Sequence, residues 1–441
     1  MKNYRSWADS GSVPLAPLTG FFGTNSSGKS SLLRFLLMLK QTAESRDRGI
    51  QLELGGQKDY VELGSPKDVI FNHNDKLELA WTLCWDGGEW PVEAPTEDFR
   101  KALKYSPICF STVQSLEGKS IVCQSMSYSV ADFRFGLESS AQGGQYELTS
   151  NGYELLRPQA RPRHIGPPVK SYAFPDSARL SYTNADFLQG FELSFERALD
   201  AIQYLGPLRE DPQRQYTWSG ASPRGVGSRG ESVVDALLTA RQRNKTIRVG
   251  ARKTVPFEAY IAQWLKKLQL VHDFKIVEIS EDSSIYQIRV QQAPKSAWVP
   301  ITDVGFGVSQ LLPVLALCFA AEPGSTIILE QPEIHLHPSV QAGLADLFLD
   351  AIKVNKVQII VESHSEHFLQ RLLRRVAEEE ISQDDTALYF CENPGTGSTI
   401  RRLDVDLFGS IRNWPHGFFG DPLGESLATL EAAQKRRLSA A

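Results

Sequence analysis

A glycine-rich stretch near the N-terminus carries residues that could hold the phosphates of a nucleotide. It reads GTNSSGKSS over residues 23–31 and fits the pattern G-x-x-x-x-G-K-[ST] of a phosphate-binding loop, or P-loop. Lys29 would reach the β- and γ-phosphates, and the Ser30 hydroxyl would ligate Mg²⁺. The nucleotide-binding residues expected in this loop are Gly23, Asn25, Ser26, Ser27, Gly28, Lys29, Ser30 and Ser31. The competing interpretation is a chance glycine turn, which would not require a strand before the loop and a helix after it.

A second group of polar residues follows two apolar stretches in the C-terminal half. STIILE ends in Glu330, and KVQIIV leads into ESHSEHF, which places His364 at the end of an apolar strand. In an open parallel sheet, ligands bind outside the carboxyl ends of the strands. We therefore expect one sheet edge to gather Lys29, Ser30, Glu330, Glu333 and His364. Glu330 is the carboxylate predicted to hold Mg²⁺ together with Ser30.

The sequence also predicts the strands and helices that would position these groups. LTGFFG before the loop is typical of a buried strand, and LLRFLLMLKQT after it has helical spacing. The loop would thus lie at a helix N-terminus, whose partial positive charge favours a phosphate. Farther on, GFGVSQLLPVLALCF predicts a glycine turn followed by an apolar helix, with Ser309 near the helix start.

Between these parts, the chain has the alternating pattern of antiparallel strands. LELAWTLCW, ICFSTVQSL, SMSYSVADFRFGL and QYELTS all show it between residues 77 and 200, and FKIVEIS with SIYQIRVQQ predicts a later hairpin. The short pieces IQLELG and YVELG are also interpreted as strands. Two basic stretches, Arg157–Lys170 and Arg241–Lys253, are either solvated surface or contacts for nucleic acid.

Composition narrows the class of protein. The 441 residues carry a net charge of −5, which argues against a uniformly basic nucleic-acid-binding surface. The apolar run from Leu311 is too short to span a bilayer, so we expect a cytoplasmic protein with no membrane contact. The five cysteines are scattered without a C-x-x-C pair, which favours buried thiols over a disulfide framework or a zinc site.

The motifs together resemble those of ABC-type ATPase heads, and in particular the OLD-like and RecF-like (SMC-like) branch of bacterial "AAA family ATPases". The resemblance is carried by GTNSSGKSSLL, GFGVSQLLPVL, ILEQPEIHLHP and VESHSEHFLQRLL. The branch that the motifs resemble includes the ATPase subunits of anti-phage systems such as Septu and PARIS. The resemblance implies an α/β fold, a P-loop NTPase of the ABC-ATPase head type with an inserted antiparallel β-rich region, and ATP and Mg²⁺ as cofactors.

The resemblance also implies a division of the chain. The first half of the head, with the P-loop, would span residues 1–80, and its second half residues 301–420. The β-rich insertion would span residues 81–200, a connecting α/β lobe residues 201–300, and a polar helical tail residues 421–441. Arg209, in the turn GPLR, would lie near the nucleotide.

In this family two heads close around ATP, so that the signature loop of one subunit meets the P-loop of the other. Here the signature loop would be Gly305–Gln310, with Gly305, Gly307 and Ser309 as nucleotide contacts. His364 would be the switch histidine, and His335 and His337 would follow the acidic strand end. A metal site on these two histidines is the alternative, but no third ligand follows at suitable spacing.

One departure from the family pattern concerns hydrolysis. The residue after the acidic strand end is usually the glutamate that polarises the attacking water, and here it is Gln331. A glutamine cannot accept the proton, so we expect slow hydrolysis, or hydrolysis that uses Glu333. The predicted catalytic residues are Glu330, Gln331, Glu333 and His364.

Three functions follow as hypotheses. The first is an ATPase subunit that dimerises around ATP and regulates a separately encoded effector, such as a nuclease or toxin, in bacterial anti-phage defence. The second is a RecF-like DNA-maintenance ATPase that contacts DNA directly, and the third a transporter subunit. Asp404 and Asp406 are expected to be solvent-facing strand residues and not nuclease ligands.

Overall fold

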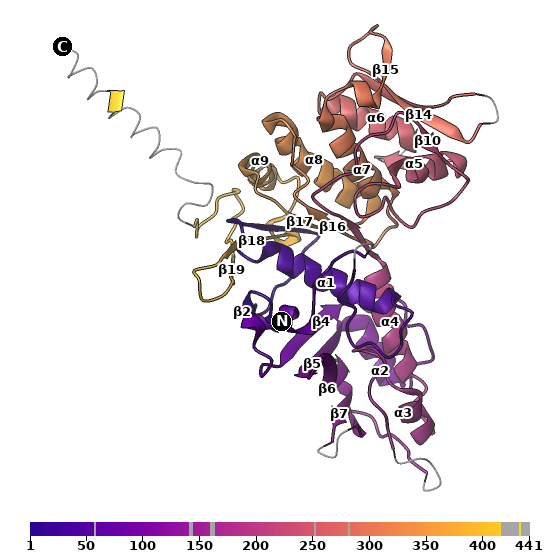
Figure 1. Cartoon of the computed structure of the whole chain (residues 1–441), viewed down its shortest axis with the longest axis vertical. Coiled ribbons are helices and arrows are strands. Elements are labelled where there is room, and N and C mark those ends of the chain that lie inside the picture. Colours follow the sequence, from indigo (N-terminus) through magenta and orange to yellow (C-terminus); the bar gives the residue numbers. More distant parts are fainter. Residues whose placement is uncertain are drawn as a thin grey trace.

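The computed structural model shows an elongated molecule in which one sheet separates two lobes (Figure 1). The structure describes residues 1–56, 59–140, 144–158, 164–250, 253–280, 283–415 and 432–433. The tail predicted at residues 421–441 therefore lies outside the described residues, apart from two positions. Among the described residues, no helix combines the length and apolar character needed to cross a bilayer.

The central sheet has six strands in the order β19-β18-β3-β17-β16-β9. Its strands are β3 (Leu18–Gly23), β9 (Ile202–Leu205), β16 (Thr326–Glu330), β17 (Gln358–Glu362), β18 (Thr386–Glu392) and β19 (Thr399–Arg402). All neighbours pair in parallel except β19, which pairs antiparallel with β18. The parallel arrangement brings the carboxyl ends of β3, β16 and β17 to one edge, as the sequence predicts.

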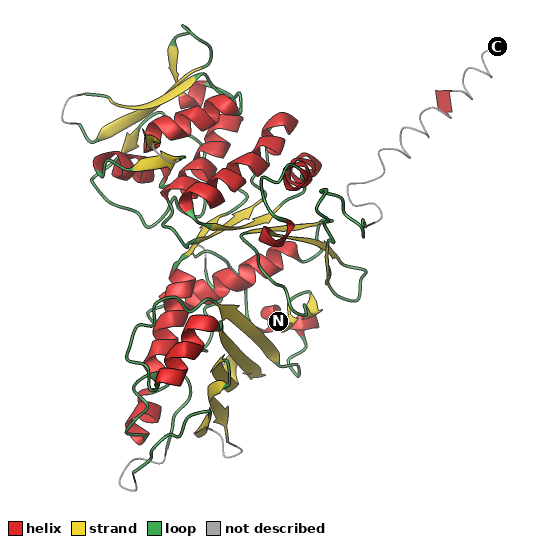
Figure 2. Ribbon diagram, turned by 180° about the vertical axis from the view of Figure 1, so that it is seen from behind, coloured by secondary structure: helices red, strands yellow, loops and turns green. Residues whose placement is uncertain are grey.

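Helices cover both faces of this sheet (Figure 2). Ile328 and Ile360 face the core that contains α1 (Lys29–Glu44). Ile327 and Ile359, one residue earlier on each strand, face the core of the opposite lobe. That core holds α7 (Phe306–Ala320), α8 (Pro338–Asn355) and α9 (Glu366–Ala377). Burial on both faces explains why these strands are apolar without alternation.

The lower lobe contains the predicted antiparallel region. Its seven-stranded sheet has the order β2-β1-β4-β5-β6-β7-β8. The strands are β1 (Lys2–Tyr4), β2 (Trp7–Asp9), β4 (Leu79–Trp85), β5 (Ile108–Glu117), β6 (Ser120–Val130), β7 (Phe133–Ser139) and β8 (Tyr146–Asn151). Three helices complete the lobe, α2 (Glu97–Tyr105), α3 (Asp176–Ser181) and α4 (Leu188–Asp200). The sheet thus begins with the first residues of the chain.

The upper lobe contains the second β region and the remaining helices. β13 (Asp273–Glu278) and β14 (Ile285–Gln291) form the predicted hairpin, joined by β10 (Tyr216–Thr217) and β15 (Trp298–Pro300). A separate hairpin pairs β11 (Thr246–Val249) with β12 (Lys253–Pro256). The helices are α5 (Val233–Gln242) and α6 (Phe257–Lys267). Short 3₁₀ turns lie at Pro66–Val69, Phe71–His73, Ile301–Asp303 and Gln383–Asp385.

Three local predictions are wrong. IQLELG and YVELG are loops and not strands. Side chains of α1 hydrogen-bond to their backbone N–H groups: Thr42 Oγ1 accepts the Glu53 N–H at 2.8 Å, and Gln41 Oε1 accepts the Val61 N–H at 3.2 Å. Asp404 and Asp406 lie beyond β19, which ends at Arg402.

The cysteine prediction is also wrong for one pair. Cys84 on β4 and Cys109 on β5 form a disulfide. They are directly opposite each other in the antiparallel register, a proximity that their separation of 25 residues does not reveal. Cys123, Cys318 and Cys391 are buried free thiols.

The buried carboxyl of Glu192 on α4 should make stability depend on pH. Burial raises its pKa to about 7, although the carboxylate accepts the Phe174 N–H at 2.7 Å. Because this folded-state pKa lies above the unfolded value, the stability contributed is fully present below about pH 4.5 and is lost as pH rises toward about 7. Glu192→Gln should therefore be more stable than the wild type at pH 8, by roughly 1–3 kcal/mol, and nearly equal at about pH 4.

Denaturant unfolding at the two pH values measures this difference. Glu147→Gln, an exposed carboxyl on β8, is the matched control and should change neither value. An equal pH dependence in the wild type and Glu192→Gln would contradict the assignment.

Candidate functional site

The P-loop connects the end of β3 to the start of α1, and two of its glycines are required by their surroundings. A Cβ on Gly23 would lie 1.9 Å from the carbonyl oxygen of Cys391 on β18. Gly28 caps α1 with φ 92°, and a Cβ there would lie 2.4 Å from Ser398 Oγ. A side chain at Gly23 would collide with the backbone of β18, and one at Gly28 with the side chain of Ser398, so packing by itself favours glycine at both positions.

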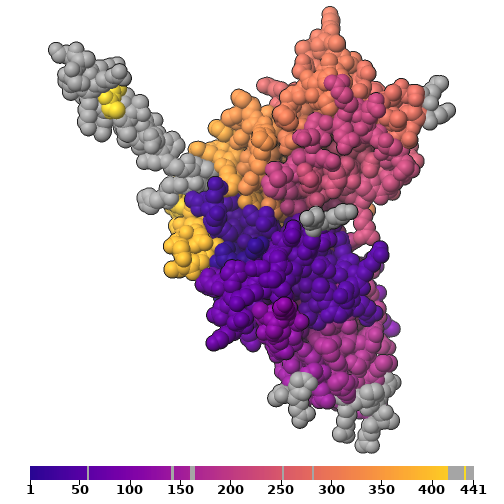
Figure 3. All heavy atoms as spheres, in the orientation of Figure 1, coloured from indigo at the N-terminus to yellow at the C-terminus, as the bar shows by residue number. Residues whose placement is uncertain are grey.

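Residues from both ends of the chain hold this loop in place. Trp7 Nε1 donates to the Gly28 carbonyl oxygen at 3.1 Å. Ser6, in the turn between β1 and β2, bonds Ser398 through its hydroxyl at 2.8 Å, and its carbonyl oxygen accepts the Ser398 N–H at 2.6 Å. Figure 3 shows the segment near residue 400 on the surface beside the N-terminal region. The loop conformation thus depends on contacts far away in sequence.

Lys29 and Ser30 are the first two residues of α1. Lys29 is only 3% exposed, and its ammonium donates to the carbonyl oxygens of Gly23 at 3.1 Å and Thr24 at 2.7 Å. Burial lowers the pKa of Lys29, and the negative charge of Glu362 acts against that shift. Ser30 Oγ donates to Glu362 Oε1 at 3.0 Å. A hydroxyl and a carboxylate in contact are oxygen ligands of the kind that Mg²⁺ prefers.

The loop faces a cavity of about 510 Å³, which is within the size range of small-molecule sites. The cavity brings the P-loop together with Gln331, Glu362 and His364. Its other lining residues come from the β1–β2 turn, from α1 and from the loop before β4, namely Arg5, Ser6, Arg34, Asp68, Ile70, Asn72 and His73. This is the place in the described chain where most of the predicted site residues meet.

Glu330 and Glu333 are buried and are not among the residues that line this cavity. Glu330, at the tip of β16, is 2% exposed and accepts the Tyr204 hydroxyl at 3.0 Å. Burial, with Glu362 nearby, raises the pKa of Glu330 to about 7. Glu333 accepts the His364 N–H at 2.6 Å, and burial raises its pKa. Glu333 therefore positions the backbone of His364.

Gln331 and His364 follow the tips of β16 and β17. Gln331 has a left-handed backbone, with φ 44°, and its N–H donates to the Glu362 carbonyl oxygen at 2.8 Å. Partial burial and the charge of Lys29 lower the pKa of His364, which favours its neutral form. Both side chains line the cavity beside the P-loop.

Sequence reasoning missed Glu362. It ends the apolar strand directly before Ser363 and His364. Glu362 carries the same signal as Glu330, because each is the carboxylate at the end of an apolar parallel strand. Arg209 is 8% exposed and close enough for Glu330 and Glu333 to influence it, but burial still lowers its pKa to about 10.

The predicted signature loop lies elsewhere. Gly305 caps α7, and the Ser309 hydroxyl donates to the Phe306 carbonyl oxygen at 2.9 Å. Neither these two residues nor Gly307 lines the cavity of the P-loop. Phe306, at the start of α7, is 63% exposed. Within one chain, the structure does not bring this loop to the P-loop.

His335 and His337 are both exposed. His337 Nδ1 accepts the Ser339 N–H at 3.3 Å and so caps α8. Within the described ranges, no three His, Cys, Asp or Glu side chains are grouped as a metal site.

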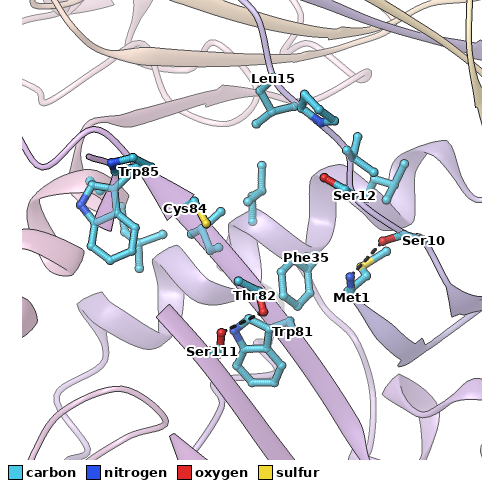
Figure 4. Close-up of a pocket in the computed structure, with 18 of the residues that line it drawn as sticks. Met1, Ser10, Ser12, Leu15, Phe35, Trp81, Thr82, Cys84, Trp85 and Ser111 are labelled. Carbon is cyan, nitrogen blue, oxygen red and sulfur yellow. Dashed lines mark hydrogen bonds between the residues drawn. The ribbon is translucent and has the colours of Figure 1, made fainter. Parts of the chain in front are cut away.

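A larger cavity, of about 1180 Å³, lies between α1, β4 and residues 9–15 (Figure 4). Figure 4 shows Phe35, Trp81 and Trp85 around it, with a Thr82–Ser111 hydroxyl contact of 2.9 Å. It contains none of the predicted site residues, so chemistry and not volume assigns the site to the smaller cavity.

Comparisons with known proteins find two family models and a distant relative. The family model described as "AAA domain, putative AbiEii toxin, Type IV TA system" matches residues 120–370, and one described as "Protein of unknown function (DUF3696)" matches residues 381–428. An OLD nuclease of Thermus scotoductus is 21% identical over 425 residues, which are 94% of this chain and 66% of that protein. The chain thus spans slightly less than two thirds of this relative's length.

Solved structures of SMC heads are also similar. One, bound to the C-winged helix domain of ScpA, has a TM-score of 0.46 and 12% identity over 92% of this chain and 96% of that one. The SMC head domain of Thermotoga maritima has a TM-score of 0.37 and 11% identity over 92% and 97%. The first family model covers more than half of the chain and includes β16, β17 and His364. The chain belongs to this AAA domain family.

Proposed function

We propose that this protein binds Mg·ATP at the P-loop cavity, dimerises around it and hydrolyses it slowly. The observation that carries this proposal is the cavity in which Lys29 and Ser30 meet Gln331, Glu362 and His364. Lys29 would neutralise phosphate charge, and the N–H groups at the start of α1 would bind phosphate oxygens. Mg²⁺, held in part by the Ser30 hydroxyl, would neutralise the charge shared by the β- and γ-phosphates.

Dimerisation is supported by where α7 begins. Gly305, Gly307 and Ser309 do not line the P-loop cavity of their own chain, and Phe306 beside them is exposed. A second chain could present the same loop to the cavity in a two-fold arrangement. The nucleotide would then lie between two subunits.

Complementation between two inactive variants tests the shared site. Lys29→Ala removes the phosphate-binding ammonium, and Gly305→Glu adds a repelling charge where a Cβ meets no atom within 4 Å, so the fold should persist. Each variant alone should lose ATP turnover. An equal mixture should regain about a quarter of the wild-type rate, because half of the random dimers contain one intact site of two.

The control mixes Lys29→Ala with the double variant Lys29→Ala/Gly305→Glu, a mixture that contains no intact site and should stay inactive. Mass measurement with and without Mg·ATP reports the dimer directly. Failure of the first mixture to recover activity, with a mass unchanged by ATP, would contradict a site shared between chains.

We expect ATP hydrolysis to be slow because Gln331 occupies the position of the usual general base. This side chain lines the cavity where the resemblance implies a general base, whereas Glu333 is held at the backbone of His364. The ATP-bound dimer would therefore be long-lived, and the protein would act as a switch more than as a motor.

Gln331→Glu should raise steady-state phosphate release roughly tenfold or more, because a positioned general base contributes about 10²–10⁴-fold. Gln331→Ala is the matched control and should give no gain. Fast turnover in the wild type that survives Glu333→Ala would refute the proposal.

The partner is proposed to be a separately encoded effector in anti-phage defence. Support for a partner comes from the description of the matching family, which names a toxin–antitoxin system, a system of more than one component. The second candidate, direct action on DNA, is favoured by the similarity to a protein named OLD nuclease. The basic stretch Arg241–Lys253 supports it less, because Arg241 pairs with Glu258 and Lys245 Nζ donates to the Ala320 carbonyl oxygen at 2.8 Å.

Expression of the chain with its neighbouring genes in a phage-sensitive host should lower phage plating, and Lys29→Ala should abolish that protection. Equal protection by the variant would refute an ATP-dependent defence role. DNA binding measured by fluorescence anisotropy over a salt series separates the second candidate, which requires an affinity that falls steeply with salt.

A further inference from the structure

The carboxylate nearest the P-loop is not the one expected from the family pattern. β17 lies between β3 and β16, and in the parallel register Glu362 is paired with Phe21 on one side and Glu330 on the other. Glu362 is therefore one strand away from the P-loop strand, and Glu330 is two strands away.

The contacts of Glu362 point into the cavity. Its Oε1 accepts the Ser30 hydroxyl at 3.0 Å, whereas its Oε2 is buried without a hydrogen-bond partner. The side chain is 2% exposed and lines the cavity together with the P-loop. A buried carboxylate oxygen without a donor is costly, so a cation at this position would satisfy it.

The hydrogen bond of Glu330 lies on the side of β16 that faces away from β17. Glu330 Oε1 accepts the hydroxyl of Tyr204 on β9, the strand on the far side of β16 from β17. Glu330 is not among the residues that line the cavity. Its contacts thus tie β16 to β9 and do not face the nucleotide.

We infer that Glu362, and not Glu330, is the carboxylate that holds Mg²⁺ together with Ser30. This inference rests on the proposed binding of Mg·ATP. Mg²⁺ keeps several waters and takes one or two carboxylates besides phosphate oxygens, so Ser30 and Glu362 suffice as its protein contacts. Glu330 is then a positioning residue, which fixes the tip of β16 and the Gln331 that follows.

The test compares Glu362→Gln with the matched variant Glu330→Gln in the full chain. Binding of a fluorescent ATP analogue is followed while Mg²⁺ is titrated, a readout independent of hydrolysis. Glu362→Gln should raise the Mg²⁺ concentration at half-saturation by roughly 10–100-fold, the usual effect of losing a metal-supporting group. Glu330→Gln should change it less than about threefold.

Binding of the analogue without Mg²⁺ should be similar in all three proteins, which shows that the P-loop is intact. Glu362→Asp, which keeps the charge, should restore part of the Mg²⁺ affinity and covers the case in which the glutamine variant does not fold. Loss of Mg²⁺ dependence in Glu330→Gln but not in Glu362→Gln would overturn the inference. A wild type that binds no ATP analogue at all would instead refute the proposed function.

Discussion

The pairing of β17 with β3 on one side and with β16 on the other brings the P-loop, Gln331, Glu362 and His364 together. Three parallel strands end at the same edge, and each delivers its next residues to that edge: the P-loop from β3, Glu362 and His364 from β17, and Gln331 from β16. Since side chains alternate between the faces of a strand, a shift of one residue would exchange the site residues for core residues. The cores on both faces of the sheet oppose such a shift, because Ile327 and Ile328 belong to different cores.

Burial of charge is the cost of this arrangement. Lys29, Glu330, Glu333 and Glu362 are all below 8% exposure, and buried charges are stable only when paired or hydrogen-bonded. The P-loop carbonyl oxygens, Tyr204 and the His364 N–H supply those contacts. Two carboxylate oxygens, Glu333 Oε2 and Glu362 Oε2, remain without a partner. The apolar cores stabilise the fold, whereas the buried charged groups of the site destabilise it.

The sequence predicts the parts of this site that local patterns encode. The P-loop, the apolar strands that end in Glu330 and before His364, and the antiparallel region all follow from spacing, and the structure has them. Contacts between distant segments could not be predicted in the same way. The order of β3, β17 and β16, and hence the prominence of Glu362, depends on strand pairing, and the Cys84–Cys109 bond depends on register across β4 and β5. The loops around Glu53 and Val61 are unlike strands because Gln41 and Thr42 of α1 occupy their backbone groups.

The support of the P-loop by Ser6 and Ser398 has a consequence for biosynthesis. These two residues are 392 positions apart, although their hydroxyls are in contact. At roughly 5–20 residues per second, a ribosome needs about 20–80 s between making one and making the other. For most of that interval the glycine loop lacks both Ser398 and β18, the strand whose Cys391 carbonyl oxygen lies against Gly23. The proposed nucleotide site is therefore completed only after Ser398 has been made, long after the glycine loop itself.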